Sequence, residues 1–282
     1  MINWILLMER LWGFYTDKTW VEPFLVFAIA FFAMGTIMMF MALVFIRYRR
    51  IRRQELVKEY QATVEEILMG VMFTDSIFAT IVNDEKMAKL FKSPLFRQTL
   101  MDGTLNLHRN YEGQYAENLE KFYAESHLIR DSFKKIKSLN WAKKCLGIEE
   151  LAEMQVTQAF DTFVELSKSS VRPLKIAAIR GCIKLNGTQG LVHLVKHKDP
   201  IDTWTQLSII HALKKGDIET TKGIEKLLTS SNKSVVSLGL KVIQALKLSD
   251  NFPAVIQLHS KTQSDLIKSE ASRVMAKLEN FN

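Results

Sequence analysis

The chain has 282 residues, a formal net charge of +8 and 48% hydrophobic residues, and its mean hydropathy is +0.01. With only five prolines and 12 glycines, residues that break helices, the composition favours an all-α fold. Five of the excess positive charges lie between Arg47 and Arg53, so the remaining chain is only mildly basic, which argues against a nucleic-acid-binding domain with a strongly basic face.

Residues 1–22 are predicted to form a short segment outside the cytoplasm. Its apolar residues, within positions 4–15, are too few to span a bilayer as a helix. Two interpretations remain open. The segment is either a short helix that lies on the outer membrane surface or an outer extension of the membrane helix that follows it.

Pro23–Ile46 is a run of 24 residues without a charged side chain. About 20 apolar residues cross a bilayer as a helix. A cleaved signal peptide has a shorter apolar core, a basic start and a site of small residues for cleavage. Because this run is longer and its basic cluster follows it, we predict a retained transmembrane helix at residues 23–46.

A cluster of five arginines follows the apolar run, whereas the preceding flank is slightly acidic. Positive flanks stay in the cytoplasm, so we expect a single-pass protein of the bacterial inner membrane with its N-terminus outside. The cluster also favours binding of anionic lipid headgroups, in addition to setting the topology. Its members are Arg47, Arg49, Arg50, Arg52 and Arg53.

Three small residues, Ala28, Gly35 and Ala42, recur every seven positions within the apolar run. Small residues on one face of a transmembrane helix let a second helix approach closely. Ala and Gly are also common in such helices without any packing role. The pattern therefore marks a candidate packing face, with ordinary membrane-helix composition as the alternative.

Residues 47–137 are predicted as the basic juxtamembrane region followed by a divergent helical cap. Asp84 and Ser93 occupy positions typical of helix starts, and Phe96–Asn110 and Tyr115–Leu128 are expected to form a helix pair. The apolar stretch Ile67–Val82 is too short to span a membrane. We expect it to be buried or to lie on the membrane.

Residues 138–282 contain an internal repeat with a period near 32 residues. Apolar triplets with i, i+3 spacing mark one face of a first helix in each repeat, and the middle residues of successive triplets are 31 to 33 positions apart. The triplets are Cys145/Ile148/Leu151, Ile176/Ile179/Cys182, Leu207/Ile210/Leu213, Leu240/Ile243/Leu246 and the degenerate Ser272/Met275/Leu278.

Between the first helices lie shorter helical patterns, bounded by turn-forming residues. Such helix pairs bury their apolar faces only by stacking on neighbours, which predicts an α-solenoid. The second helices are expected at Val156–Lys168, Gln189–His197, Glu219–Thr229 and Phe252–Ser260.

Val171-Arg172 followed by Lys175–Arg180, the Asn186-Gly187 turn and Asp199-Pro200 resemble the short bacterial form of the HEAT repeat. The period is shorter than that of long HEAT units. Tetratricopeptide repeats would fit the length, but their spaced Trp, Gly-Tyr and Pro markers are missing, as is the Thr-Pro-Leu-His motif of ankyrin repeats. The resemblance covers about half of the chain and implies an architecture and a binding role rather than an activity.

The motif search favours a non-catalytic protein without cofactors or metals. The sequence contains no Gly-rich phosphate loop, no GxSxG elbow and no HExxH motif. His193 and His197 have the i, i+4 spacing of metal ligands but no carboxylate nearby, so we expect them on a solvated face. We also expect Glu65-Glu66 and Glu149-Glu150 to face solvent, and Cys145 and Cys182 to be small core residues.

The function that this architecture implies is a membrane-anchored scaffold that binds a protein partner, for example in an inner-membrane polysaccharide-synthesis or secretion complex. The second helices are expected to line the concave side, where lysines would form a ledge for an acidic partner. The alternative is a nucleic-acid-binding repeat protein tethered to the membrane. Such a protein would need basic and aromatic residues that alternate along one surface, whereas Trp141, Trp204 and Tyr123 are scattered along the chain. The ledge consists of Lys168, Lys196, Lys198, Lys222 and Lys226.

Overall fold

A computed structural model of the chain describes residues 21–73, 81, 84–215 and 221–279. The described secondary structure consists of α-helices and short 3-10 helices without a strand, which confirms the all-α class. The chain forms two compact units, Met1–Ala62 and Thr63–Asn282. Most of the predicted outer segment, residues 1–20, lies outside the described residues.

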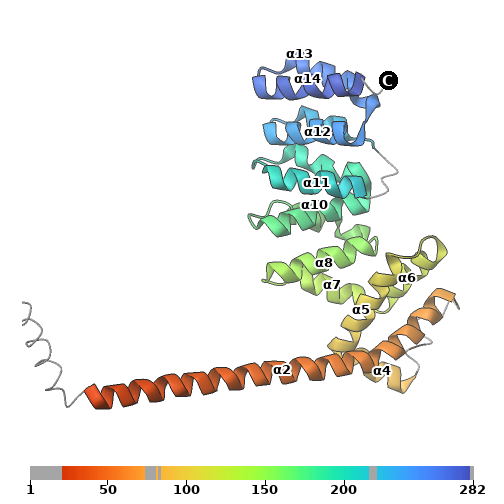
Figure 1. Ribbon diagram of the computed structural model, residues 1–282. Coiled ribbons are helices and arrows are strands. Elements are labelled where there is room, and N and C mark those ends of the chain that lie inside the picture. Colours follow the sequence, from red (N-terminus) through yellow and green to blue (C-terminus); the bar gives the residue numbers. More distant parts are fainter. Residues whose placement is uncertain (1–20, 74–80, 82–83, 216–220, 280–282) are drawn as a thin grey trace, which may run out of the picture. The chain divides into compact units, whose positions relative to one another are not determined.

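In the first unit the dominant element is α2 (Val21–Phe73, 53 residues), which Figure 1 shows as one long helix. The large apolar side chains from Phe24 to Ile46 are 51–74% exposed. The helix is long and apolar enough to cross a membrane. Its uncharged stretch coincides with the predicted membrane segment at residues 23–46.

In the second unit the last turns of α2 pack against helix α5 (Pro94–His108). Val64 and Leu68 are buried, and a Cβ placed on Gly103 would lie 2.8 Å from Leu68 Cδ1, so the glycine allows the two helices to approach closely. Ile67, Val71 and Met72 are also buried, as expected for the start of the apolar stretch Ile67–Val82. Residues 74–80 and 82–83 of that stretch lie outside the described residues.

Two helices before the repeats begin at the residues that the sequence predicts. Asp84 caps α4 by accepting a hydrogen bond from Lys86 N at 2.9 Å, and Ser93 caps α5 by accepting from Phe96 N. The predicted helix pair corresponds to α5 and α6. The bounds are α4 (Glu85–Lys92), α5 (Pro94–His108), α6 (Gln114–Glu125) and α7 (Leu128–Ile136).

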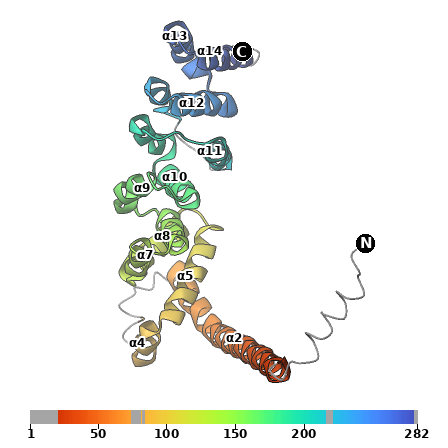
Figure 2. The ribbon, with the colours of Figure 1, turned by 90° about the vertical axis from the view of Figure 1, so that its left-hand side faces the viewer.

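From α7 onward the helices alternate between two layers, which Figure 2 shows nearly end-on as two columns. One layer contains the first helices of the repeats: α8 (Trp141–Glu153), α10 (Arg172–Asn186), α11 (Thr203–Lys215), α12 (Lys233–Leu246) and α14 (Asp265–Glu279). The other contains α7, η1 (Thr157–Ala159) with α9 (Phe160–Leu166), η2 (Gly187–Lys196), η3 (Ile224–Thr229), and η4 (Ser249–Asn251) with α13 (Phe252–Lys261). Strong contacts join α7 to α8, α8 to α10 and α10 to η2, and η2 packs on η3 of the next repeat.

The elements η2 and η3 are 3-10 helices, whereas the sequence suggested ordinary helices at these positions. In η2 a Cβ placed on Gly190 would lie 2.1 Å from the carbonyl oxygen of Cys182. This close approach of η2 to α10 leaves no room for a side chain. The tighter winding of a 3-10 helix thus accompanies direct backbone packing between the layers.

The triplet pattern places the middle residues of three first helices in the core but fails at the start of α11. Ile148, Ile179 and Ile243, the middle residues of three triplets, are at most 1% exposed, but Leu207 is 54% exposed. In α11 the buried positions include Gln206, whose amide nitrogen donates to the Ile201 carbonyl at 3.0 Å and to the Ser234 carbonyl at 3.3 Å. These hydrogen bonds turn the helix so that Leu207 points to solvent.

Candidate membrane-facing and protein-binding surfaces

The arginine cluster divides into two groups on α2. The Arg49 guanidinium lies 5.4 Å from the centre of the Phe45 ring, and that of Arg52 lies 5.8 Å from the Tyr48 ring. Both distances allow cation–π attraction. These two side chains therefore fold back toward the apolar part of the helix.

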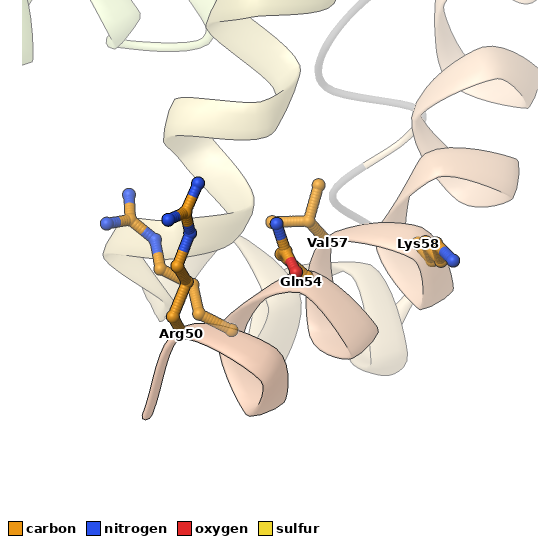
Figure 3. A pocket seen from close by; sticks show the side chains of 5 residues that line it. Arg50, Gln54, Val57 and Lys58 are labelled. Carbon is orange, nitrogen blue, oxygen red and sulfur yellow. The ribbon is translucent and has the colours of Figure 1, made fainter. Parts of the chain in front are cut away.

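The other group faces a different side of α2. Arg50, Arg53 and Lys58 line an open surface pocket together with Gln54 and Val57. Figure 3 shows Arg50 and Gln54 on successive turns of the helix. Three cations and an amide donor within two turns form a surface that suits a phosphate group, because phosphate oxygens accept several charged hydrogen bonds at once. Arg47 is also exposed.

The predicted packing face in α2 is largely uncovered. Gly35 and Ala42 are exposed and Ala28 is half-buried. Among the described residues, no atom lies within 4 Å of a Cβ placed on Gly35. The face thus has room for a second helix, and its use in packing stays a prediction.

The five ledge lysines are all exposed, but they do not form one row. Parallel packing of η2 and η3 is fixed at both ends: Thr188 donates to the Lys222 carbonyl at 2.8 Å, and Ser230 donates to the Val195 carbonyl at 2.8 Å. Lys222 therefore lies at the N-terminal ends of these elements. Lys196 and Lys198 lie at their C-terminal ends, Lys168 follows the end of α9, and Lys226 lies within η3.

A buried ionic network, which the sequence patterns did not reveal, joins α5, α6, α8 and α10. Its centre is Glu153, whose side chain is 9% exposed. One carboxylate oxygen accepts from Lys184 Nζ at 2.6 Å and Arg109 Nε at 3.2 Å, and the other lies 3.5 Å from His108 Nδ1. The opposite ring nitrogen of His108 lies 2.9 Å from Glu120.

These contacts shift the pKa values of His108 and Glu153. The hydrogen bond with Glu153 raises the pKa of His108 above its usual value, although burial opposes the shift. Burial alone would raise the pKa of Glu153, but its bonds with His108, Lys184 and Arg109 lower that pKa to about 2. Glu153 is therefore ionised throughout the physiological range.

Glu150 is a second buried acid, and the expectation that it faces solvent is wrong. It is 2% exposed, and its carboxylate accepts hydrogen bonds from Lys135 and, at 2.6 Å, from Ser132, both on α7. A neighbouring lysine and hydroxyl supply the partners that a buried carboxylate requires. Glu149 is exposed, as predicted.

The two histidines with metal-ligand spacing are also not on a solvated face. His197 is 8% exposed and His193 is half-buried. The Nδ1 atom of His193 lies 2.7 Å from the Gly190 carbonyl, and that of His197 lies 3.0 Å from the Asp199 carbonyl. Burial lowers the pKa of His193. Across the described residues, no three His, Cys, Asp or Glu side chains gather in a way that could hold a metal ion.

The cysteines differ in their surroundings. Cys182 is fully buried, as predicted, and burial raises its pKa to about 12. Cys145 is only half-buried.

Comparison of the chain with protein-family models, with curated proteins and with solved structures finds no match. Functional interpretation therefore rests on the surfaces described above.

Proposed function

We propose that the chain is a membrane-anchored adaptor, in which α2 crosses the bacterial inner membrane once and a HEAT-like solenoid in the cytoplasm binds a protein partner. One observation carries the proposal: a helix apolar enough to cross a membrane continues, in the same chain, into stacked helix pairs. Stacked pairs of this kind present extended surfaces for binding other proteins. Anchoring such a surface would concentrate it beside a membrane complex, such as one for polysaccharide synthesis or secretion.

The arginine cluster supports an orientation with the N-terminus outside and the solenoid in the cytoplasm. In this orientation Arg50 lies about one helical turn beyond the apolar segment, near anionic lipid headgroups, and Arg53 and Lys58 follow on the cytoplasmic side of the headgroup layer. Each basic residue near such a surface contributes about 1 kcal/mol of attraction. Arg49 and Arg52, stacked on aromatic rings at the end of the apolar run, suit the membrane interface, where amphipathic side chains gather.

The orientation is tested with a reporter that is active only in the cytoplasm. We expect activity when it is fused after Asn282 and none when it is fused before Met1. Replacing all five arginines by glutamine is expected to give a mixed orientation, because these residues supply the charge bias. Activity of the N-terminal fusion alone would reverse the assignment.

The adaptor role is tested by cross-linking intact membranes and purifying the full-length protein. We expect specific membrane proteins to copurify with the wild-type chain. The matched control replaces the buried Ile243 by aspartate, which places an unpaired charge in the apolar core of the solenoid and leaves α2 unchanged. Equal recovery of the same proteins with both chains would contradict the proposal, because the anchor alone would then account for the association.

A further inference from the structure

The exposed apolar side chains of the solenoid concentrate on one edge. Among the described residues between 138 and 279, eight large apolar side chains are exposed. Five of them lie at, or just before, the N-terminal ends of first helices, although these ends make up only a small part of the repeat region. They are Leu139, Trp141, Val171, Trp204 and Leu266.

Contacts between neighbouring repeats show that this edge is continuous from α10 to α12. Arg172 at the start of α10 pairs with Asp202 before α11 at 3.6 Å. Ile201 N donates to Ser234 Oγ at the start of α12 at 2.8 Å, and Asn232 donates to the Asp199 carbonyl at 2.8 Å. The N-terminal ends of α10, α11 and α12 are thus held side by side.

Three lysines on the same edge carry free positive charge. Lys196 is the last residue of η2, Lys198 lies in the segment that leads into α11, and Lys233 is the first residue of α12. All three are exposed, and within the described part of the chain none forms an ion pair. Together with the five apolar residues they define a surface that we call the N-terminal edge.

The composition of the N-terminal edge is that of a protein-binding surface. Trp141 and Trp204 are 48% and 64% exposed, and tryptophan is the residue type that most often dominates the binding energy of protein interfaces. The edge also contains the exposed acids Asp199 and Asp265. The three lysines outnumber these two acids, so the edge keeps a positive excess for an acidic partner, while its exposed tryptophans favour a protein over a polyphosphate.

We propose that the N-terminal edge binds an acidic, apolar segment of a partner protein. The tryptophans occupy apolar pockets of that segment, and its carboxylates pair with Lys196, Lys198 and Lys233. This proposal rests on the adaptor function and moves the binding surface from the second helices to the N-terminal ends of the first helices. Of the predicted ledge, Lys196 and Lys198 belong to it, whereas Lys168, just after the end of α9, pairs with Glu165 at 2.7 Å.

A direct test uses the full-length chain in nanodiscs of uncharged phosphatidylcholine. The probe is a fluorescent peptide of repeating glutamate, alanine and leucine, and its affinity is measured by fluorescence anisotropy. We expect Trp204→Ala to weaken binding about tenfold or more, as at an interface hot spot. The combined change of Lys196, Lys198 and Lys233 to glutamate is expected to reduce the association rate and its dependence on salt.

Two matched variants control for general effects. Ile256→Ala removes an exposed apolar side chain from the other layer, and Lys222→Glu with Lys226→Glu reverses charges away from the edge. Both are expected to bind the peptide as the wild type does. Equal loss in edge and control variants, or equal binding of a peptide with glutamine in place of glutamate, would overturn the proposal. So would tighter binding of single-stranded DNA or phosphatidylserine vesicles that responds to the same edge variants.

In cells, a photo-reactive residue is placed at Trp204 and, as a control, at Ile256. We expect a discrete cross-link to a membrane protein from position 204 that disappears when the three edge lysines are reversed. If both positions cross-link equally, the edge proposal fails while the adaptor function stands. If no membrane protein is retrieved from either position or by purification, the adaptor function itself fails.

Discussion

The two ends of the repeat stack are stabilised by different interactions. From α10 to α14 the buried residues form one continuous apolar cluster, which includes Leu191, Leu227, Leu240 and Ile243. Between α5 and α10 apolar side chains such as Leu151 and Phe163 are also buried, but the helices are joined in addition through the buried acids Glu150 and Glu153 with their basic partners. Repeats that stack on similar repeats bury matching apolar faces, whereas the junction with the preceding helices adds buried charged groups.

The two regions therefore contribute to the fold differently, one mainly to its stability and the other to the choice of neighbouring helices. Apolar burial stabilises the stack but discriminates weakly between neighbours, because the faces resemble one another. A buried ion pair adds less net stability, since desolvation offsets the attraction, but leaving one partner unpaired is strongly unfavourable. We infer that the ionic network specifies which helices meet at the start of the stack, and the following variants test the comparison.

The largest effect is expected from a cavity in the apolar region. Ile243→Ala should reduce the free energy of unfolding by about 4 kcal/mol, because it removes three buried carbon atoms and leaves a cavity. Ile243→Val, which removes one of them, should cost about 1 kcal/mol. Urea denaturation of the detergent-solubilised chain, followed by circular dichroism, measures both. A loss below 1 kcal/mol for the alanine variant would show that the apolar cluster does not hold this end together.

A smaller loss is expected when the ionic region is disturbed. Glu153→Gln should destabilise the chain by about 3 kcal/mol, because Lys184, Arg109 and His108 would lose their shared anion. Glu149→Gln is the matched control on the same helix, and because Glu149 is exposed its change should stay within about 0.5 kcal/mol. If the two variants unfold at the same urea concentration, the network does not stabilise the junction.

The smallest effect concerns pH. His108 has a raised pKa in the folded chain, so its contribution is fully present below its unfolded pKa of about 6.5 and is lost as the pH rises through the higher folded value. Glu153 has a lowered pKa, so its contribution is lost only as the pH falls below about 4.5 toward 2.

The junction is therefore expected to be most stable between about pH 4.5 and pH 6.5. His108→Gln should remove about 2 kcal/mol, the value of one hydrogen bond to a charged group, at pH 6 and little at alkaline pH. Unfolding curves across this range, compared with the same series for the exposed His211→Gln, measure the effect. An equal loss for His108→Gln at acidic and alkaline pH would show that the histidine acts by packing alone.

Sequence patterns predicted the order and positions of most elements because helix signals are local. Capping by Asp84 and Ser93 depends on neighbouring backbone groups. The spacing within each triplet, whose middle residues include Ile148, Ile179 and Ile243, depends on helical periodicity. The pattern failed at Leu207, because the rotation of α11 is set by hydrogen bonds between Gln206 and residues of the next repeat. Helix α7 was not distinguished, because its role in the stack depends on partners in α8.

The sequence by itself determined that the chain is helical, that one helix is apolar enough for a membrane and that a 32-residue pattern repeats toward the C-terminus. Only the tertiary structure decided that Glu150 is buried, that Glu153 lies at the centre of an ionic network and that the ledge lysines divide between two edges. It also brought Trp141 and Trp204, two repeats apart, to equivalent positions. The physical reason is that periodicity depends on neighbours along the chain, whereas charge pairing and surface composition depend on residues that only folding brings together.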